Sequence, residues 1–373
     1  KLNFNLYNKR KNMKNIIKTV IVMLSSVSLF ASANAGELGV SGTAKATYNI
    51  LSGKTNVGKG LGITNELNFT ASGELDNGYT WSYSMELDPG ATTPAATTAD
   101  TENTQNAQND DTKLTLTTPY GTVGMFISEG GLDLEDGASQ SVYARPTDMG
   151  DPSATSDNFT IDSYNNLQYH TPADMLPFGT SFKVAYAPNI ADPAPGASGN
   201  NAGTVHTISS TDSGNNATEM QVKTAPIDGL ALGASYFEFD GSGIAKSDQE
   251  AESGAYYATY ATGPVSVGYS KAYKATLRAD GDFTTTTNVS YYDQTNYSIA
   301  FAASDDLSVS YERETSEANY VNNTAVEQES SAVQVAYTMG GMTIALSHGS
   351  HDNVGYVDAA NQDQTLFAVT MAF

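Results

Sequence analysis

The sequence has no cysteine, few basic residues and no long apolar run beyond one short stretch near its start, and each shortage excludes a class of protein. Without cysteine there is no disulfide framework, no thiol nucleophile and no cysteine-ligated metal. Lysine and arginine together number 18 against 41 aspartates and glutamates. This acidity excludes the basic surface that binding to nucleic acid requires, so no nucleic-acid partner is expected.

The apolar stretch near the start has the pattern of an export signal. Lys14 and Lys18 precede an apolar run over 19–30, and the small residues 33–35 (Ala-Asn-Ala) fit a cleavage site. A membrane anchor is the alternative, but the run is shorter than the about 20 residues that a span needs. We therefore predict a signal peptide over 13–35 and a mature domain over 36–373. Residues 1–12, ahead of Met13, are not expected in the mature protein.

After residue 35 the dominant period is two. In "YTWSYSMEL" (79–87) aromatic and aliphatic residues alternate with Thr, Ser and Glu, and "TLFAVTMAF" (365–373) alternates large with small side chains. Such alternation predicts strands with one apolar and one polar face. In the last segment the large row is Phe367, Val369, Met371 and Phe373.

Turn residues separate about sixteen such strands, and short turns alternate with long loops rich in Gly, Asn, Asp, Ser and Thr. Both ends of the mature chain fall on the short-turn side, as an even-stranded up-and-down sheet requires. The predicted strands lie near 37–50, 62–75, 79–88, 112–118, 121–128, 160–170, 180–188, 217–225, 229–240, 254–262, 265–273, 287–303, 306–315, 328–338, 341–350 and 363–373.

Alternation alone also fits a soluble sandwich or propeller, so other features have to decide. The polar rows are small and wettable, whereas the apolar rows are bulky, and aromatic residues gather at both ends of the apolar rows. Two belts of aromatic rings suit the two interfaces of a membrane. Lipid forbids open sheet edges, so we predict an all-β, antiparallel transmembrane barrel with a water-filled interior.

The leader, the alternation of short turns with long loops, and the ending "TLFAVTMAF" on Phe373 resemble a general porin of the Gram-negative outer membrane, of the alphaproteobacterial type. The resemblance covers 36–373. It implies a 16-stranded, multi-pass barrel with short periplasmic turns, long extracellular loops and a third loop folded into the pore. It also implies a homotrimer in contact with membrane lipid and lipopolysaccharide.

The same resemblance implies that the barrel-assembly machinery recognises the C-terminal strand. The signal would consist of Phe367, Val369, Met371 and Phe373, with Phe373 as its key residue. The family often places an aromatic residue where this chain has Thr365, a small departure.

By resemblance, the third long loop, 129–158, would constrict the pore. Its candidate residues are Glu129, Asp133, Glu135, Asp136 and Arg145. A solvated surface loop is the alternative. We favour the constriction because loops of this length in compact proteins are usually functional.

The polar faces of the predicted strands place further charges on the pore wall: Lys45, Glu66, Glu86, Lys113 and Lys183. A narrow passage lined by more acid than base concentrates cations, so we expect a cation preference. The alternative is that most of the negative charge lies on outer loops and hardly affects permeation.

The four histidines form no recognisable catalytic or metal-binding set, so neither an enzyme nor a cofactor is expected. The predicted function is passive diffusion of ions and small hydrophilic solutes. A secreted β-rich adhesin or surface-layer structural protein is the alternative, and it would pack the apolar rows together instead of facing them to lipid.

Overall fold

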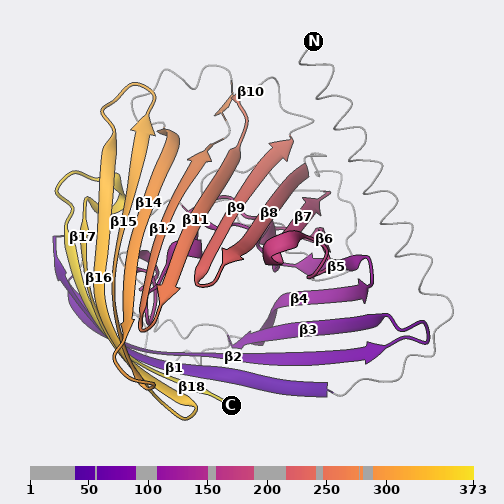
Figure 1. Ribbon diagram of the computed structural model, residues 1–373. Helices are drawn as coiled ribbons and strands as arrows, with labels where there is room; N and C mark the ends of the chain where they lie inside the picture. Colours follow the sequence, from indigo (N-terminus) through magenta and orange to yellow (C-terminus); the bar gives the residue numbers. More distant parts are fainter. Residues whose placement is uncertain are drawn as a thin grey trace.

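The computed structural model describes residues 38–54, 57–89, 107–149, 157–188, 216–240, 247–276, 278–279 and 289–373. Within them, sixteen antiparallel strands close into a single barrel (Figure 1). The predicted signal peptide over 13–35 lies outside the described residues, as does the part 150–156 of the third loop. Among the described residues, no helix is both long and apolar enough to cross a membrane.

Each barrel strand pairs with its neighbours in the chain, and β1 pairs with β18 to close the sheet. The strands are β1 (Leu38–Gly53), β2 (Gly58–Glu74), β3 (Thr80–Pro89), β4 (Ala107–Thr118), β5 (Gly121–Ile127), β6 (Asn166–His170), β7 (Ser181–Ala187), β8 (Asn216–Ile227), β9 (Leu230–Asp240), β11 (Glu252–Thr262), β12 (Val265–Ala275), β14 (Val289–Ala302), β15 (Leu307–Tyr320), β16 (Val326–Met339), β17 (Met342–Asp352) and β18 (Gln362–Ala372). The predicted fold class is confirmed.

The register places apolar rows on the outer face of the barrel. Val335, Leu346 and Phe367 are partners across β16, β17 and β18, and they are 38%, 52% and 43% exposed. One residue along, Gln334, Ser347 and Leu366 are partners on the inner face and are buried. Because the apolar rows face outward, the alternative of an adhesin or surface-layer protein with these rows in a core is wrong.

The chain end is tied into the closing seam of the barrel. Phe373 N donates to Gly42 O at 3.0 Å, and Gly42 N donates to Phe373 O at 2.8 Å. A Cβ atom on Gly42 would lie 2.8 Å from the Phe373 ring, so glycine is what lets the ring lie over β1. The aromatic C-terminus is therefore part of the barrel wall.

One end of the barrel carries the short connections that the sequence predicts, at 75–79, 119–120, 171–180, 228–229, 263–264, 303–306 and 340–341. This is called the short-turn side below, and the opposite end the long-loop side. Two 3₁₀ helices, η4 (Pro177–Gly179) and η6 (Val354–Tyr356), lie in connections, one at each end.

The strand bounds differ locally from the prediction, and β15, for example, continues to Tyr320 where 315 was predicted. The strand predicted over 160–170 begins only at Asn166, because the residues before it continue the third loop. Strand β4 begins at Ala107, earlier than the predicted 112. On the long-loop side, β10 (Ser247–Gln249) and β13 (Arg278–Ala279) form an additional two-stranded sheet that the composition of their loops did not suggest.

Candidate functional site: the loop inside the barrel

The third loop, here called the inner loop (described residues 128–149 and 157–165), lies against the inner wall of the barrel. It contains the 3₁₀ helices η1 (Glu135–Ala138), η2 (Pro146–Asp148) and η3 (Ile161–Ser163). Its backbone bonds to lumen-facing side chains of successive strands from β8 to β18. Donor–acceptor pairs are Leu132 N to Glu219 at 3.3 Å, Leu134 N to Ser235 at 3.0 Å, Val142 N to Ser310 at 3.0 Å, Tyr143 N to Gln334 at 3.0 Å and Gln364 Nε2 to Met149 O at 2.8 Å.

Small residues on the wall let the inner loop approach closely. At Gly268 of β12 an added Cβ would overlap the carbonyl oxygen of Ala138, and at Gly233 of β9 it would lie 2.9 Å from the Leu134 side chain. Apolar contacts complete the attachment: Leu132 and Ile161 are buried in a cluster with wall residues that include Phe237. Burial of these side chains against the wall holds both ends of the inner loop in place.

Three buried glutamates of the wall bind the inner loop. Glu219 Oε2 accepts the backbone N–H of Ile161 at 2.8 Å and that of Leu132. On β15, Glu312 Oε2 accepts the hydroxyls of Ser139 and Ser141, both at 2.6 Å. Glu314 Oε2 accepts the Thr147 hydroxyl at 2.7 Å and the Thr147 backbone N–H at 3.1 Å. Because the three carboxyl groups are buried, loss of a loop partner would leave a buried polar group unsatisfied, which makes these residues the main anchors.

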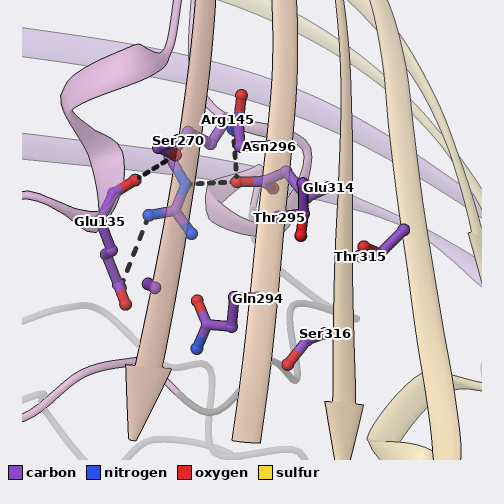
Figure 2. A pocket seen from close by; sticks show the side chains of 10 residues that line it. Glu135, Arg145, Ser270, Gln294, Thr295, Asn296, Glu314, Thr315 and Ser316 are labelled. Atoms are coloured by element: carbon purple, nitrogen blue, oxygen red, sulfur yellow. Dashed lines mark hydrogen bonds and ion pairs between the residues drawn. The ribbon is translucent and has the colours of Figure 1, made fainter. Parts of the chain in front are cut away.

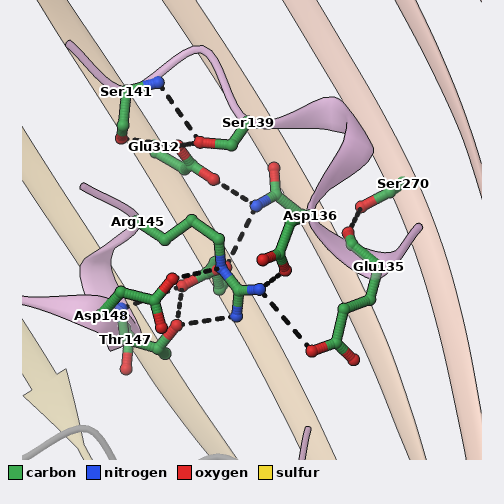
Figure 3. Close-up of polar contacts among 12 residues, drawn as sticks. Glu135, Asp136, Ser139, Ser141, Arg145, Thr147, Asp148, Ser270 and Glu312 are labelled. Atoms are coloured by element: carbon green, nitrogen blue, oxygen red, sulfur yellow. Dashed lines mark hydrogen bonds and ion pairs between the residues drawn. The ribbon is translucent and has the colours of Figure 1, made fainter. Parts of the chain in front are cut away.

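Arg145 is the centre of the charged network (Figure 3). Its side chain is 8% exposed, and its Nε lies 2.7 Å from Glu314 Oε1. It also pairs with Asp136 in η1 and lies 3.7 Å from Glu135, 3.6 Å from Asp148 and 3.8 Å from Asp157. The guanidinium therefore joins two parts of the inner loop to β15.

The network shifts the ionisation of its members. Burial alone would lower the pKa of Arg145, but Glu314 and Glu135 raise it above its usual value, so the guanidinium stays charged. Burial, with Asp133 as a second cause, raises the pKa of Glu135 well above its usual value. Proton uptake by Glu135 leaves Glu314 and Asp136 as the nearest counter-charges of Arg145.

Little space separates the inner loop from the wall beside Arg145. Figure 2 shows Arg145 between Glu135 and Glu314, at a cavity of about 20 Å³ lined by residues of β12, β14 and β15. Such a space holds one water molecule at most. Solutes cannot pass between the inner loop and this part of the wall.

A larger cavity of about 470 Å³ opens on the lumen side of the inner loop. Its charged lining consists of eight acids and one arginine: Asp111, Glu129, Asp133, Glu135, Asp136, Asp148, Asp157, Asp162 and Arg145. Burial raises the pKa of Asp148 and of Asp162. Within the described ranges, no cluster of three or more His, Cys, Asp or Glu has the geometry to hold a metal ion.

A sequence model described as Gram-negative porin matches residues 19–373. The chain belongs to the Gram-negative porin family. It is therefore a multi-pass protein of the outer membrane that forms a channel. No relative was found among curated protein sequences.

Solved porins share the fold at low sequence identity. Salmonella typhi OmpF in complex with daunomycin has 13% identity and a TM-score of 0.61, over 91% of this chain and 98% of that one. A triple mutant of Rhodopseudomonas blastica porin has 13% identity and a TM-score of 0.57, over 90% and 100%. A porin refined at 1.8 Å has 16% identity and a TM-score of 0.57 over the same shares.

The structure places the predicted loop residues of this porin at different points of the cavity. Glu135, Asp136 and Arg145 come together in one network. Asp133 lies beside it, accepting from Ser235 Oγ at 3.1 Å. Glu129 stands apart at the start of the inner loop, where it forms an ion pair with Lys113 of β4.

The predicted wall residues all lie on the inner face but do not form one group. Lys45 Nζ lies 5.9 Å from the ring centre of Tyr143, so it faces the inner loop across the seam. Glu66 accepts hydrogen bonds from Thr43 Oγ1 at 3.3 Å and from Asn68. Glu86 is the cross-strand partner of Asn68, so it lies near Glu66. Lys183 lies on β7, on the other side of the lumen.

The anchors Glu312 and Glu314 and the cavity acids Asp111, Asp157 and Asp162 are not among the predicted site residues. Glu312 and Glu314 continue the polar row of Ser308 and Ser310 in a predicted strand, which signals a lumen position but not a loop contact. Asp162 lies in the segment 160–165, which was wrongly predicted as strand. The alternation that identified the other strands therefore led to Asp162 being missed as a loop residue.

Arg145→Met should release the inner loop from β15. The substitution keeps the volume but leaves the buried Glu314 without its counter-charge, and breaking a buried pair costs about 3–5 kcal/mol. We expect noisier single-channel current and faster proteolysis of the inner loop in detergent, while the heat-modifiable mobility of the barrel on SDS gels stays as in the wild type.

Arg313→Met is the matched control, because Arg313 forms a half-exposed pair with Glu329 at 2.7 Å on the outer face of the same strand. Among the described residues, this pair makes no contact with the inner loop, so current and proteolysis should hardly change. Wild-type noise and wild-type cleavage in Arg145→Met would show that Arg145 does not hold the inner loop.

Proposed function

We propose that this porin is a passive diffusion channel for ions and small hydrophilic solutes, in which the inner loop sets the aperture and favours cations. The observation that supports it is the acid-lined cavity of about 470 Å³ on the lumen side of the inner loop. The loop is fixed to the wall by Glu219, Glu312 and Glu314, so the aperture it leaves has a defined shape.

The charge of the cavity supports the preference for cations. Lys113 and Arg145 neutralise part of the lining, and Glu135 takes up a proton readily, yet carboxylates remain in excess. Asp136, Asp148 and Asp157 are about half exposed, so they act on ions in the water of the cavity. Low-dielectric walls focus this field along the passage.

Removing exposed carboxylates should weaken the preference. A unit charge about 7 Å from an ion in water changes its energy by about 0.6 kcal/mol, which is roughly threefold in local concentration. The double variant Asp136→Asn/Asp148→Asn should therefore lower the cation-to-anion permeability ratio about twofold to tenfold. Reversal potentials across a KCl gradient measure this ratio.

Asp305→Asn serves as the control, because Asp305 lies in a short turn outside the cavity and its loss removes the same kind of charge. It should leave the ratio unchanged. An anion-selective wild type, or equal effects of the two changes, would contradict a preference set by the inner loop.

The preference should also depend on pH. Because burial raises the pKa of Asp148 and Asp162, these groups take up protons at higher pH than exposed aspartates. As the pH falls from neutral, cation preference should begin to fall while the pH is still above about 3.9, the ordinary aspartate pKa. Asp148→Asn should reduce this early change, and a ratio that stays constant down to that pH would argue against the assignment.

We further propose that the wall mediates three contacts: with membrane lipid and lipopolysaccharide, with two further copies in a homotrimer, and with the barrel-assembly machinery. The exposed outer row of β18 supports the last. Phe367, Met371 and Phe373 are 43%, 53% and 68% exposed, and Val369 continues the same row. An unassembled chain would present this row at its end.

Phe373→Ala should lower the amount of folded protein in the outer membrane several-fold, because the terminal ring would be missing when the machinery binds the strand. Phe301→Ala is the matched control: Phe301 is an outward aromatic residue, 44% exposed, at the short-turn end of β14. Quantifying heat-modifiable protein in outer-membrane fractions tests this. Equal amounts for both variants would exclude a special role of Phe373.

A further inference from the structure

Two lysines lie side by side on the inner wall, on the short-turn side of the inner loop. Lys183 of β7 is the cross-strand partner of Gln221 on β8, and Lys223 is the partner of Ser181. Both lysines belong to the inward row that contains the buried Gln221. Diagonal neighbours on one face of a sheet lie about 7 Å apart, so one small ligand can contact both ammonium groups.

The start of the inner loop borders the Lys183–Lys223 pair. Gln168 Nε2 donates to Gly130 O, and Gln221 Nε2 donates to Leu132 O at 2.9 Å. Because the Gln168 amide N–H groups are used by Gly130 and Asn166, its Oε1 accepts from His170 Nε2 at 2.8 Å. His170 is the partner of Lys183, and its Nδ1 is left unprotonated when the ring is neutral.

No acid pairs with Lys183 or Lys223 among the residues that the structure describes. Lys223 and Lys113 carry the same positive charge as Lys183 and repel it electrostatically. Lys113 differs from the other two because it has Glu129 as a partner. Like charges on one face of a sheet are destabilising, and an arrangement of this kind inside a channel indicates a binding function.

We propose that Lys183 and Lys223 form a subsite for the oxyanion of a small solute, a phosphate or a carboxylate. The proposal rests on the diffusion channel proposed above. Two ammonium groups supply up to six donors, and a phosphate bridging them would be neutralised without displacing any protein contact. This subsite differs from the acid-lined cavity in charge, in strands and in position along the pore.

The order of charges along the strands makes the subsite easier for an anion to reach from the short-turn side than from the long-loop side. Along β8, Glu219, Gln221 and Lys223 face the lumen in this order toward the short turn, and along β4 Asp111 precedes Lys113. On these two strands acids therefore lie on the long-loop side and lysines on the short-turn side. An anion that comes from the long-loop side meets the acidic cavity first, whereas one from the short-turn side reaches the lysines directly.

Single-channel recording with inorganic phosphate as the probe tests the proposal. In KCl of constant ionic strength, phosphate added to the short-turn side of wild-type channels should reduce the current in a saturable way, and more strongly than from the other side. Lys183→Gln and Lys223→Gln should each weaken the apparent affinity about tenfold, the effect of losing one hydrogen bond to a charged group. Lys183→Arg keeps the charge and should retain the effect.

Two controls separate a subsite from general lumen charge. Lys45→Gln removes a lumen lysine on the other side of the barrel, beside Tyr143, and Lys59→Gln removes an outward one on β2. Both should retain the phosphate effect. An absent effect in conducting wild-type channels, or a loss in Lys45→Gln equal to that in Lys183→Gln, would overturn the proposal.

Equilibrium dialysis of phosphate against detergent-solubilised protein gives a readout that needs no conduction. Binding by the wild type, with about tenfold weaker binding by Lys183→Gln, would support the subsite even if the channel did not conduct. A protein that conducts KCl but binds no phosphate would leave the diffusion channel standing and refute the subsite. Heat-modifiable mobility verifies that each variant is folded.

Discussion

Lipid offers no hydrogen bonds, and this constraint determines the rest of the structure. Every backbone N–H and C=O group at membrane depth has to find a partner within the sheet, so the sheet must have no edge. Pairing of β1 with β18 meets this requirement and takes in the last residue, Phe373. Closure also separates lipid from water, so each strand presents alternate residues to two different solvents.

The inner loop also needs hydrogen-bond partners, in its case inside the barrel. Its backbone is enclosed by the barrel, and its polar groups have no ladder of their own. Side chains of the wall supply the partners instead: Glu219, Glu312 and Glu314 accept from it, and Gln221 and Gln364 donate to it. Glu314 also has a counter-charge, which Arg145 provides from the loop itself. The wall glutamates that hold the loop are thus distinct from the aspartates that the loop presents to the cavity.

Sequence reasoning identified the strands because lipid and water impose a period of two over long distances. It failed at 160–165 for a physical reason. Phe159 and Ile161 alternate like strand residues, but they pack on Phe237 inside the lumen rather than facing lipid. The roles of Glu312 and Glu314 were also beyond reach, since Thr147 and Glu314 are 167 residues apart and alternation shows which face a residue occupies, not what lies opposite. Charges in the third loop were found, but their arrangement around Arg145 was not.

The inner loop also gives the pore a direction along its axis. A barrel wall with mixed charges would present acids and lysines to solutes at every height. Here the loop enters near Gln168 and Gln221 and brings Asp133, Asp136 and Asp148 together on one side of that level. The lysines of β7 and β8 remain uncovered on the other side. Screening limits the electrostatic range of each charged group to about 8 Å at physiological salt. A solute therefore meets the acidic region and the lysines one after the other. The charge of the solute decides from which end it enters more easily.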